Sequence, residues 1–188
     1  MKTVLLYDSG DDDARVLHST LRAVANKAGE AYSFDVSREL PAACVGCFGC
    51  WTKTPGLCVL PRDGGTVYAE KSWDADYIVT VSRILWGAFS MPIKAYTDRL
   101  LPTMLPGFKR INGMMRHRPR YGRIPILLAC GYGASSTAEE KTFCDFARAQ
   151  RDQGGVSRES GSFVVPRGAS AQALCGDCAK WLGKELAK

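Results

Sequence analysis

The sequence predicts one α/β domain: a doubly wound, five-stranded parallel sheet with helices on both faces. Short apolar runs alternate along the chain with segments of helical periodicity, a pattern typical of parallel strands joined by helices. The chain has 188 residues, which suits a single domain over residues 1–188. Hydrophobic residues make up 46% of it and charged residues 23%, which excludes a disordered or collagen-like protein.

The first part of the chain predicts two strands and two helices around a cysteine-rich insertion. The apolar run Thr3–Tyr7 indicates a buried strand. Asp12–Ala28 indicates a helix, because apolar residues recur at helical spacing and three aspartates stand at its start, where carboxylates favour the helix dipole. Ala31–Val36 follows as a second strand, Pro41–Gly65 as the irregular cysteine-rich insertion, and Thr66–Trp73 as a short helix.

The second part of the chain predicts three more strands. Tyr77–Val81 is a strongly apolar strand, and Ser82–Phe89 follows it as a loop. A helix is expected over Ser90–Leu101, with Pro92 in its first turn and Pro102 ending it. The remaining elements are expected to be a strand at Ile124–Cys130, a helix from a Ser136/Glu139 capping box to Gly154–Gly155, a strand at Ser162–Val165 and a helix at Ala169–Lys188.

No segment has the length of a membrane span. The longest apolar runs, such as Ile124–Cys130, fall well short of the roughly 20 residues that cross a bilayer. The apolar run Val4–Tyr7 is too short for a secretory signal and leads directly into Asp8. We therefore expect a cytoplasmic protein without a membrane partner.

The loops at the carboxyl ends of the predicted strands are the expected ligand site. Five strands joined by helices suit the flavodoxin-like doubly wound order, in which ligands bind outside these ends at the switch point of the sheet. In this chain the ends are Asp8–Asp13, Ser82–Phe89 and Gly131–Ser136. Each is rich in Gly, Ser or aromatic residues.

Four cysteines in the insertion carry the strongest chemical signal. Cys44, Cys47, Cys50 and Cys58 follow the spacing C-x2-C-x2-C-x7-C. Two-residue spacers let successive thiolates turn toward one centre, which favours an iron–sulfur cluster. Zinc sites more often use two C-x2-C pairs set well apart. Buried inert thiols and a reversible disulfide remain open alternatives.

The other four cysteines are less specific. Cys175 and Cys178 form a lone C-x-x-C in the last predicted helix, which indicates either a redox pair or, more simply, two half-buried helical cysteines. Cys130 and Cys144 are expected in the core.

Two segments resemble a known family. The stretch from Cys47 to Cys58, Cys-Phe-Gly-Cys-Trp-Thr-Lys-Thr-Pro-Gly-Leu-Cys, resembles a segment common in the flavodoxin-like NAD(P)H-dependent FMN reductases. Their relatives, the iron–sulfur flavoproteins, carry a compact cysteine motif in the same place. Trp86-Gly-Ala-Phe-Ser90, with the later Lys94, Asp98-Arg-Leu100 and Pro102, looks like the flavin-ring loop and the following helix of that family.

A third match extends the resemblance to about Cys44–Tyr121. Ile111-Asn-Gly-Met114 and His117-Arg-Pro-Arg-Tyr121 are similar to a segment seen in one branch. The family implies a flavodoxin-like fold, bound FMN, NAD(P)H as electron donor and often a homo-oligomer. If FMN binds, we expect its contacts to come from Ser9, Gly10, Arg83, Ile84, Leu85, Trp86, Gly87, Ala88, Phe89, Gly131, Tyr132 and Gly133. The cysteine motif of Cys44, Cys47, Cys50 and Cys58 is a candidate for a 4Fe-4S cluster. The alternative for Trp86 and Phe89 is core packing, and for the glycines a role in turns alone.

The first loop departs from the family pattern. The family has a Gly-Ser-Pro-Arg type of loop that holds the FMN phosphate, whereas this chain reads Asp8-Ser-Gly-Asp-Asp-Asp13. The Ser9–Gly10 backbone still offers N–H donors. Each like-charge contact at about 4 Å, however, costs on the order of 1–4 kcal/mol, depending on the effective dielectric. The alternative role of these aspartates is ordinary helix capping.

Two further departures lie in the ring loop. Arg83 stands where the family has proline, and Leu85 where an aromatic residue is common. We hypothesise that Arg83 supplies a cation that compensates the acidic first loop.

The net charge of +6 resides in one segment. Lys109–Arg123 holds six basic residues and no acidic one, which leaves 19 basic and 19 acidic residues elsewhere. A solvated loop or an oligomer interface is the favoured interpretation of this segment. It could instead attract the phosphates of NADPH or an acidic redox partner, and nucleic-acid binding is the least favoured possibility.

The predicted function is an FMN-dependent oxidoreductase or electron-transfer flavoprotein that uses NAD(P)H and a small-molecule or protein electron acceptor. The cofactor would carry the chemistry, which fits a chain whose two histidines, His18 and His117, form no visible acid–base pair. The alternative is a degenerate flavodoxin-like module that binds no FMN and acts through its cysteines or a protein partner.

Overall fold

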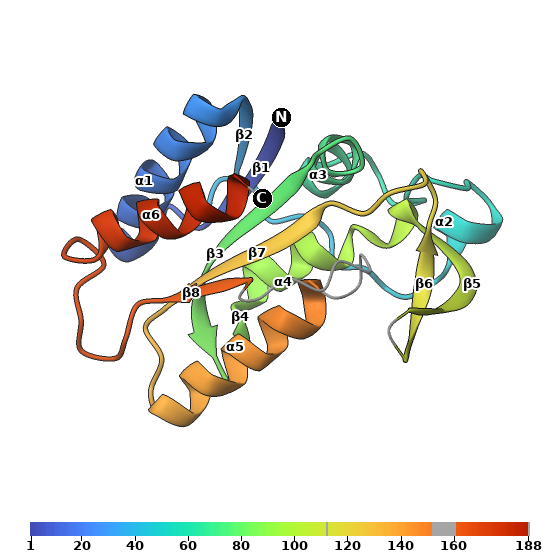
Figure 1. Ribbon diagram of the computed structural model, residues 1–188. Coiled ribbons are helices and arrows are strands. Elements are labelled where there is room, and N and C mark those ends of the chain that lie inside the picture. Colours follow the sequence, from blue (N-terminus) through green and yellow to red (C-terminus); the bar gives the residue numbers. More distant parts are fainter. Residues whose placement is uncertain (112, 152–160, 188) are drawn as a thin grey trace.

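The computed structural model has the predicted doubly wound sheet (Figure 1). It describes residues 1–111, 113–151 and 161–187. The strand order is β2-β1-β3-β7-β8, all parallel, and the short strand β4 (Ala88–Phe89) pairs antiparallel to β3. The five parallel strands are β1 (Lys2–Tyr7), β2 (Glu30–Asp35), β3 (Tyr77–Leu85), β7 (Ile126–Tyr132) and β8 (Ser162–Val164).

Helices cover both faces of this sheet, as expected for strands that are apolar on both sides (Figure 1). Helices α1 (Asp12–Ala28) and α6 (Cys175–Leu186) lie on one face. Helices α3 (Gly64–Ser72), α4 (Met91–Asp98) and α5 (Thr137–Arg151) lie on the other face. None of the helices in the described ranges is long and apolar enough to span a membrane.

The two faces of the sheet are packed differently. In β1, the side chain of Leu5 packs on the α1/α6 face, and those of Val4 and Leu6 pack on the opposite face. The α1/α6 face forms one continuous hydrophobic cluster. The opposite face forms two clusters, one around Tyr68 and Tyr96 and one around Phe143.

The prediction of a loop over Ser82–Phe89 is wrong, because β3 continues to Leu85 and turns directly into β4. Trp86 and Gly87 make the turn, with φ of 55° and 74°. Two successive residues with positive φ suit a two-residue hairpin turn, because the twist of such a turn matches that of the strands. The next helix, expected to reach Leu101, ends at Asp98.

Two other sequence-based boundaries need correction. A short 3-10 helix (Leu101–Thr103) follows α4, because Pro102 cannot continue the α-helical hydrogen bonds. The last helix begins only at Cys175, not at Ala169. The predicted end of α5 at Gly154–Gly155 lies outside the described residues.

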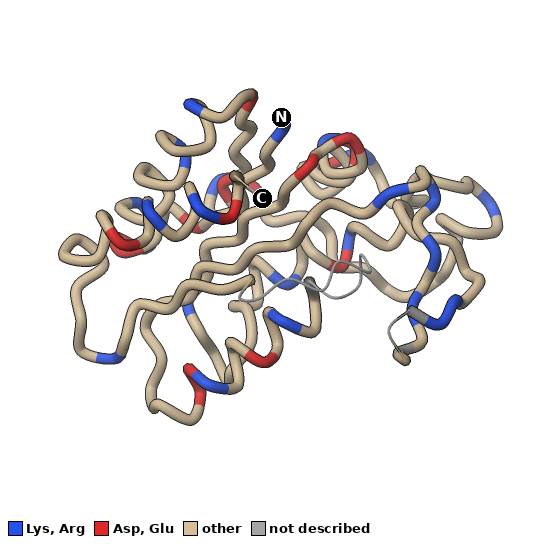
Figure 2. The backbone as a smooth tube through the Cα atoms, viewed as in Figure 1, with Lys and Arg blue, Asp and Glu red and all other residues tan. Residues whose placement is uncertain are grey.

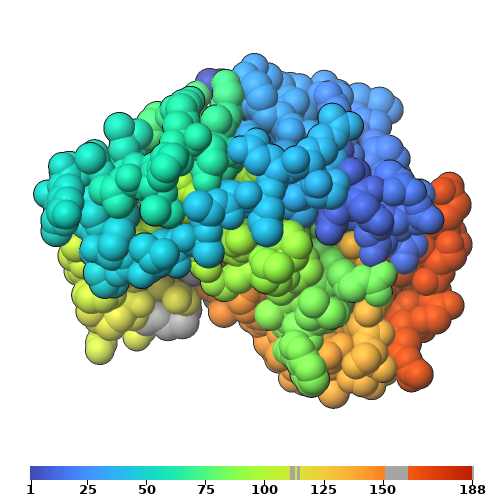
Figure 3. Space-filling model, turned by 180° about the vertical axis from the view of Figure 1, so that it is seen from behind, coloured from blue at the N-terminus to red at the C-terminus, as the bar shows by residue number. Residues whose placement is uncertain are grey.

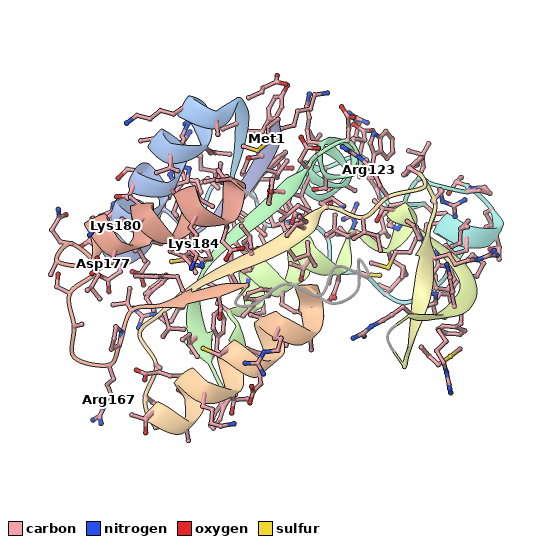
Figure 4. All side chains as sticks on the ribbon, in the orientation of Figure 1. Met1, Arg123, Arg167, Asp177, Lys180 and Lys184 are labelled. Carbon is pink, nitrogen blue, oxygen red and sulfur yellow. The ribbon has the colours of Figure 1, made fainter. Side chains whose placement is uncertain are left out.

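The basic segment is a β-hairpin, not a loop. Strands β5 (Met104–Ile111) and β6 (Met114–Pro119) pair antiparallel and form a separate two-stranded sheet. Figure 2 shows basic residues along this hairpin, at the end of the molecule away from α1 and α6. Arg123, labelled in Figure 4, follows the hairpin and contacts Asp76 just before β3 at 3.0 Å.

Arg99 anchors the cysteine-rich segment to the domain. Its side chain is 1% exposed and donates to both carboxylate oxygens of Asp63, at 2.7 and 2.9 Å. It also donates to the Ala42 carbonyl at 2.9 Å and to the Thr66 hydroxyl at 3.0 Å. Asp63 in turn caps α3 by accepting from the Thr66 amide. One buried guanidinium therefore joins α3, the end of α4 and the start of the cysteine-rich segment.

His18 is a structural residue of the α1/β2 contact. Its ring stacks on Tyr7 with centroids 3.6 Å apart, and Nε2 lies 2.8 Å from the Ser33 hydroxyl. Burial, reinforced by the positive charge of Arg22, lowers the pKa of His18 to about 4. The imidazole therefore stays neutral in the folded protein well below its ordinary pKa near 6.5.

An NMR titration of His18 should give an apparent pKa near 4. Because the unfolded chain binds this proton near pH 6.5 and the folded protein does not, stability should fall as the pH drops from about 6.5 to 4, by about 1–3 kcal/mol. A His18→Gln variant should lose this pH dependence. An apparent pKa above 6 for His18 would contradict the packing described.

Candidate functional site

Three loops meet at the carboxyl edge of the sheet, as the strand order predicts. The first loop follows β1, the β3–β4 turn follows β3, and the third loop follows β7. Arg83 at the end of β3 contacts Asp11 of the first loop at 2.6 Å. Glu139 of α5 accepts from the Trp86 amide at 3.0 Å and from the Ser135 amide at 2.8 Å. The predicted site is therefore one connected region.

The amides of the first loop are bonded to carboxylates of the chain itself. The Ser9 amide donates to Asp35 Oδ1 at 3.0 Å, and the Gly10 amide donates to Asp8 Oδ1 at 2.9 Å. These are ordinary N–H···O distances. The Ser9 hydroxyl lies 2.7 Å from the hydroxyl of Ser37.

The start of α1 is capped in the same way. Asp11 Oδ1 accepts from the Asp13 amide at 3.0 Å. Asp11 Oδ2 accepts from Arg83 Nη2 at 2.6 Å and Nε at 3.2 Å. Arg83, the hypothesised cation for a phosphate, is thus paired with Asp11.

The first loop does not fit the phosphate of FMN. A phosphate at a helix N-terminus needs backbone N–H donors that point at it. Here carboxylates already hold the Ser9, Gly10 and Asp13 amides.

Asp35 contacts the first loop, and the sequence analysis did not name it among the site residues. Its side chain is 8% exposed. Burial acts to raise the pKa of this carboxyl, but hydrogen bonds from Ser9 and Ser37 outweigh burial and hold the pKa below its ordinary value. The signal was available: Asp35 ends β2, and in this strand order the end of β2 lies beside the end of β1.

Trp86 is the most exposed aromatic residue of the site. Its side chain is 91% exposed at the tip of the β3–β4 turn, so the alternative that it packs in the core is wrong. Phe89 does pack inward, with ring centroids 5.0 Å from Phe146 and 5.9 Å from Phe143. The other predicted residues of this segment divide into exposed Arg83 and Leu85, half-buried Ala88, and buried Ile84 and Gly87.

The loop after β7 presents one of its three predicted contact residues to the site. Gly131 and Tyr132 are buried. A Cβ atom on Gly131 would lie 2.6 Å from Phe143, so this glycine permits core packing. Gly133 is exposed, has a φ of 68°, and its Cβ position is 3.0 Å from Arg83 Nη1. Gly133 thus faces the same region as Arg83.

Glu139 was expected only as part of a capping box. Its amide does donate to Ser136 Oγ at 3.2 Å. Its carboxylate, however, reaches back to Ser135 and Trp86, and hydrogen bonds from Ser135 lower its pKa. Glu139 therefore fixes the β3–β4 turn relative to the loop after β7.

The four cysteines of the insertion line one small cavity of about 20 Å³. The segment that carries them, cyan in Figure 3, lies beside the yellow β5–β6 hairpin, where Trp51 contacts His117. In the described ranges, no three His, Cys, Asp or Glu side chains converge closely enough to hold a metal ion. Burial and the neighbouring thiols raise the pKa of Cys50, which favours its protonated form. As arranged, the cavity has room for about one water molecule.

A larger cavity of about 240 Å³ lies away from the carboxyl edge. It covers the middle of β3 and β7, beneath α4 and α5, where the two hydrophobic clusters of that face are separate. Its lining is mainly apolar and includes Ile78, Leu127 and Phe89. Phe89 also belongs to the β3–β4 hairpin, so the cavity adjoins the site through this one side chain.

Comparison with known proteins supports the fold. No model of a known protein family matches the sequence, and no curated protein is significantly similar to it. Three similar solved structures cover nearly the whole chain. An FMN-dependent NADH-azoreductase from Bacillus anthracis, in complex with FMN, has a TM-score of 0.60 and 11% identity, and covers 100% of this chain and 98% of its own.

The other two are similar over the same range. The NAD(P)H:quinone oxidoreductase from Methanothermobacter marburgensis has a TM-score of 0.64 and 14% identity, with 100% of this chain and 96% of its own covered. The protein Smu.1420 from Streptococcus mutans has a TM-score of 0.66 and 10% identity, with 98% and 100% covered. At these identities the likeness shows the fold, and the chain has the flavodoxin-like architecture that its sequence predicts.

Proposed function

We propose that the protein is an NAD(P)H-dependent flavin oxidoreductase. The observation that carries this proposal is the whole-chain likeness in fold to the azoreductase and the quinone oxidoreductase, which are named for such activities. The connected loops at the carboxyl edge support it, because this is where doubly wound folds bind their ligands. In such enzymes the flavin carries the electrons and the protein supplies position and electrostatics.

The flavin ring would lie between the β3–β4 turn and the loop after β7. Trp86, Leu85 and Gly133 are exposed there. Glu139 holds the two loops together through the Trp86 and Ser135 amides. A flat aromatic ring suits the exposed face of Trp86. The buried members of the predicted set, Ile84, Gly131 and Tyr132, would support these loops from beneath.

The partners in this proposal are a nicotinamide and a small-molecule or protein electron acceptor. The basic β5–β6 hairpin could attract the phosphates of NADPH or an acidic redox protein. Exposed apolar side chains at Trp86, Phe108 and Met115 fit a homo-oligomer. All eight cysteines are free thiols, which fits a reducing compartment such as the cytoplasm.

The iron–sulfur cluster stays a hypothesis. The cysteine spacing favours it, and the four thiols share one cavity that Arg99 also lines. The Arg99 Nε is buried and has no hydrogen-bond partner, and an anionic sulfur centre would accept from it. Against this, the thiols do not converge on a metal position, and the cavity would have to open to admit a cluster.

An absorbance spectrum of protein purified without oxygen, with iron and acid-labile sulfide assayed on the same sample, tests these proposals. Bound flavin and flavin-dependent oxidation of NADH or NADPH would support the oxidoreductase. About four iron and four sulfide per chain would support the cluster. Less than one of each would reject it and leave Cys44, Cys47, Cys50 and Cys58 as thiols.

The second candidate is a flavodoxin-like module that binds no flavin. The occupied amides of the first loop favour it over an ordinary FMN enzyme. A colourless protein that takes up neither FMN nor riboflavin and oxidises no nicotinamide would support this candidate and reject the oxidoreductase.

A further inference from the structure

The first loop lies where a doubly wound fold binds phosphate. It joins β1, a central strand of the sheet, to the N-terminus of the 17-residue helix α1. In flavodoxin-like sheets a nucleotide phosphate binds at such a turn, because the first helical amides and the helix dipole favour an anion. In a flavin site of this fold, the loop would therefore lie against the end of the ribityl chain.

In this protein, three of its own carboxylate side chains occupy the positions where an anion would bind. Asp35, Asp8 and Asp11 each accept a backbone N–H of the loop or of the first helical turn, at 2.9–3.0 Å. The Asp11 amide donates to the Asp8 carbonyl at 3.2 Å. Four of the five amides of Ser9–Asp13, all but that of Asp12, are thus bonded within the chain.

The charges at the loop also oppose a phosphate. Asp35 is ionised at neutral pH, because the hydrogen bonds from Ser9 and Ser37 outweigh its burial and lower its pKa. The guanidinium groups around the loop are already paired: Arg83 is bonded to Asp11 through two nitrogens, and Arg38 lies 3.1 Å from Asp35. Arg15 pairs with Asp12 and donates to the Ser9 carbonyl. An incoming phosphate would have to displace carboxylates and would then stand beside them.

The same loop favours a neutral hydroxyl group, although it opposes a phosphate. The loop presents carboxylate oxygens, which accept hydrogen bonds, and a hydroxyl donates one. The flavin that ends in a hydroxyl instead of a phosphate is riboflavin. Its ribityl chain could donate to Asp8 without displacing that carboxylate from the Gly10 amide, since each oxygen accepts more than one bond.

We propose that the first loop uses its own carboxylates in place of a cofactor phosphate, and that the site therefore selects a flavin without a phosphate over FMN. This inference rests on the proposed flavin function. It differs from that function in predicting the order of affinities between two flavins that carry the same ring.

Binding of riboflavin and FMN to the purified full-length protein tests the inference, with flavin fluorescence as the readout at pH 7.5. The wild-type protein should bind riboflavin at least as tightly as FMN. A preference for FMN of about 30-fold or more, equal to about 2 kcal/mol, would overturn the inference. Such a preference would show that the phosphate is recognised despite the carboxylates.

Two variants make the test independent of the absolute affinity. Asp8→Ser/Asp35→Ser frees the Gly10 and Ser9 amides and should raise the affinity for FMN relative to riboflavin by about 10-fold or more. Asp12→Ser is the matched control. Asp12 stands in the same acidic run and pairs with Arg15, but its carboxylate holds no amide of the loop. Its removal should change the ratio by less than about threefold.

The outcomes distinguish a failure of this inference from a failure of the proposed oxidoreductase function. If the wild type binds neither flavin, the oxidoreductase proposal fails and the predicted preference for riboflavin fails with it. If the wild type binds FMN about 30-fold or more tightly than riboflavin, the inference alone fails. If the double variant, folded by its near-ultraviolet circular dichroism, gains no preference for FMN, the inference fails whatever the wild type binds. Asp8→Ser alone, which frees only the Gly10 amide, replaces the double variant if that variant does not fold. It should then show the same direction of change.

Discussion

Replacing Arg99 by alanine is expected to lower the free energy of unfolding by about 3–5 kcal/mol, as for other broken buried ion pairs. The guanidinium is 1% exposed, and its loss leaves the carboxylate of Asp63 without its bidentate partner. The Ala42 carbonyl and the Thr66 hydroxyl also lose a donor. Urea unfolding of wild type and variant measures the difference.

Arg62→Ala is the matched control for Arg99. Arg62 makes the same kind of two-nitrogen contact with Glu70, but its side chain is 64% exposed. Its removal should cost less than about 1 kcal/mol, because exposed pairs contribute little. Equal losses for the two variants would contradict the anchoring role of Arg99.

The Arg99 effect should depend on pH. Burial acts to raise the pKa of Asp63, but hydrogen bonds from Arg99, Thr66 and Ala42 outweigh it and hold the pKa below the ordinary value of 3.8. The pair therefore stabilises the fold above that value. Its contribution is lost as the pH falls through the lower pKa of the folded state, so the difference between wild type and Arg99→Ala should shrink in strong acid.

Replacing Gly87 by alanine is expected to cost about 2–4 kcal/mol, from overpacking and from an unfavourable φ together. Its φ of 74° lies in the left-handed region. An added Cβ would stand 2.4 Å from Thr142 Cγ2 of α5. If the protein is the proposed flavin oxidoreductase, the variant should also weaken flavin binding, since the adjacent Trp86 would shift with the turn. Thermal unfolding measures the first effect.

Gly122→Ala separates the two causes. Gly122 has a φ of 76°, and no atom lies within 4 Å of its Cβ position. Its replacement should cost only about 1 kcal/mol, the penalty of the backbone conformation alone. If Gly87→Ala costs no more than Gly122→Ala, the packing of the β3–β4 turn against α5 is not as described.

Much of the fold could be predicted because buried parallel strands leave an unmistakable pattern. The helix predicted over Asp12–Ala28 matches α1 at both ends, since its cap, apolar spacing and C-terminal glycine all agree. The β5–β6 hairpin could not be predicted in the same way. Pro106 and Gly107 interrupt β5, and basic residues replace the apolar alternation that marks a strand.

The site could be predicted in position but not in detail. The sequence alone shows that the acidic first loop departs from the family pattern. It also predicts that the aspartates of this loop repel a phosphate. The bond from the Gly10 amide to Asp8 is local, whereas the bond from the Ser9 amide to Asp35 depends on the pairing of β2 with β1. The strand order indicates that Asp35 lies near the loop, but the bond itself is seen only in the structure. The contact of Glu139 with Trp86 spans 53 residues and leaves no local signal.

The β5–β6 hairpin has a consequence for how copies of this protein meet. Neither of its strands pairs with a third among the described ones, so both outer edges present unpaired backbone groups. Such edges invite strand addition and aggregation. Lys109 and Arg110 on one strand, with Arg116 and Arg118 on the other, place positive charge along both. Two hairpins approaching edge to edge would repel, so these basic side chains oppose strand addition between copies of the chain.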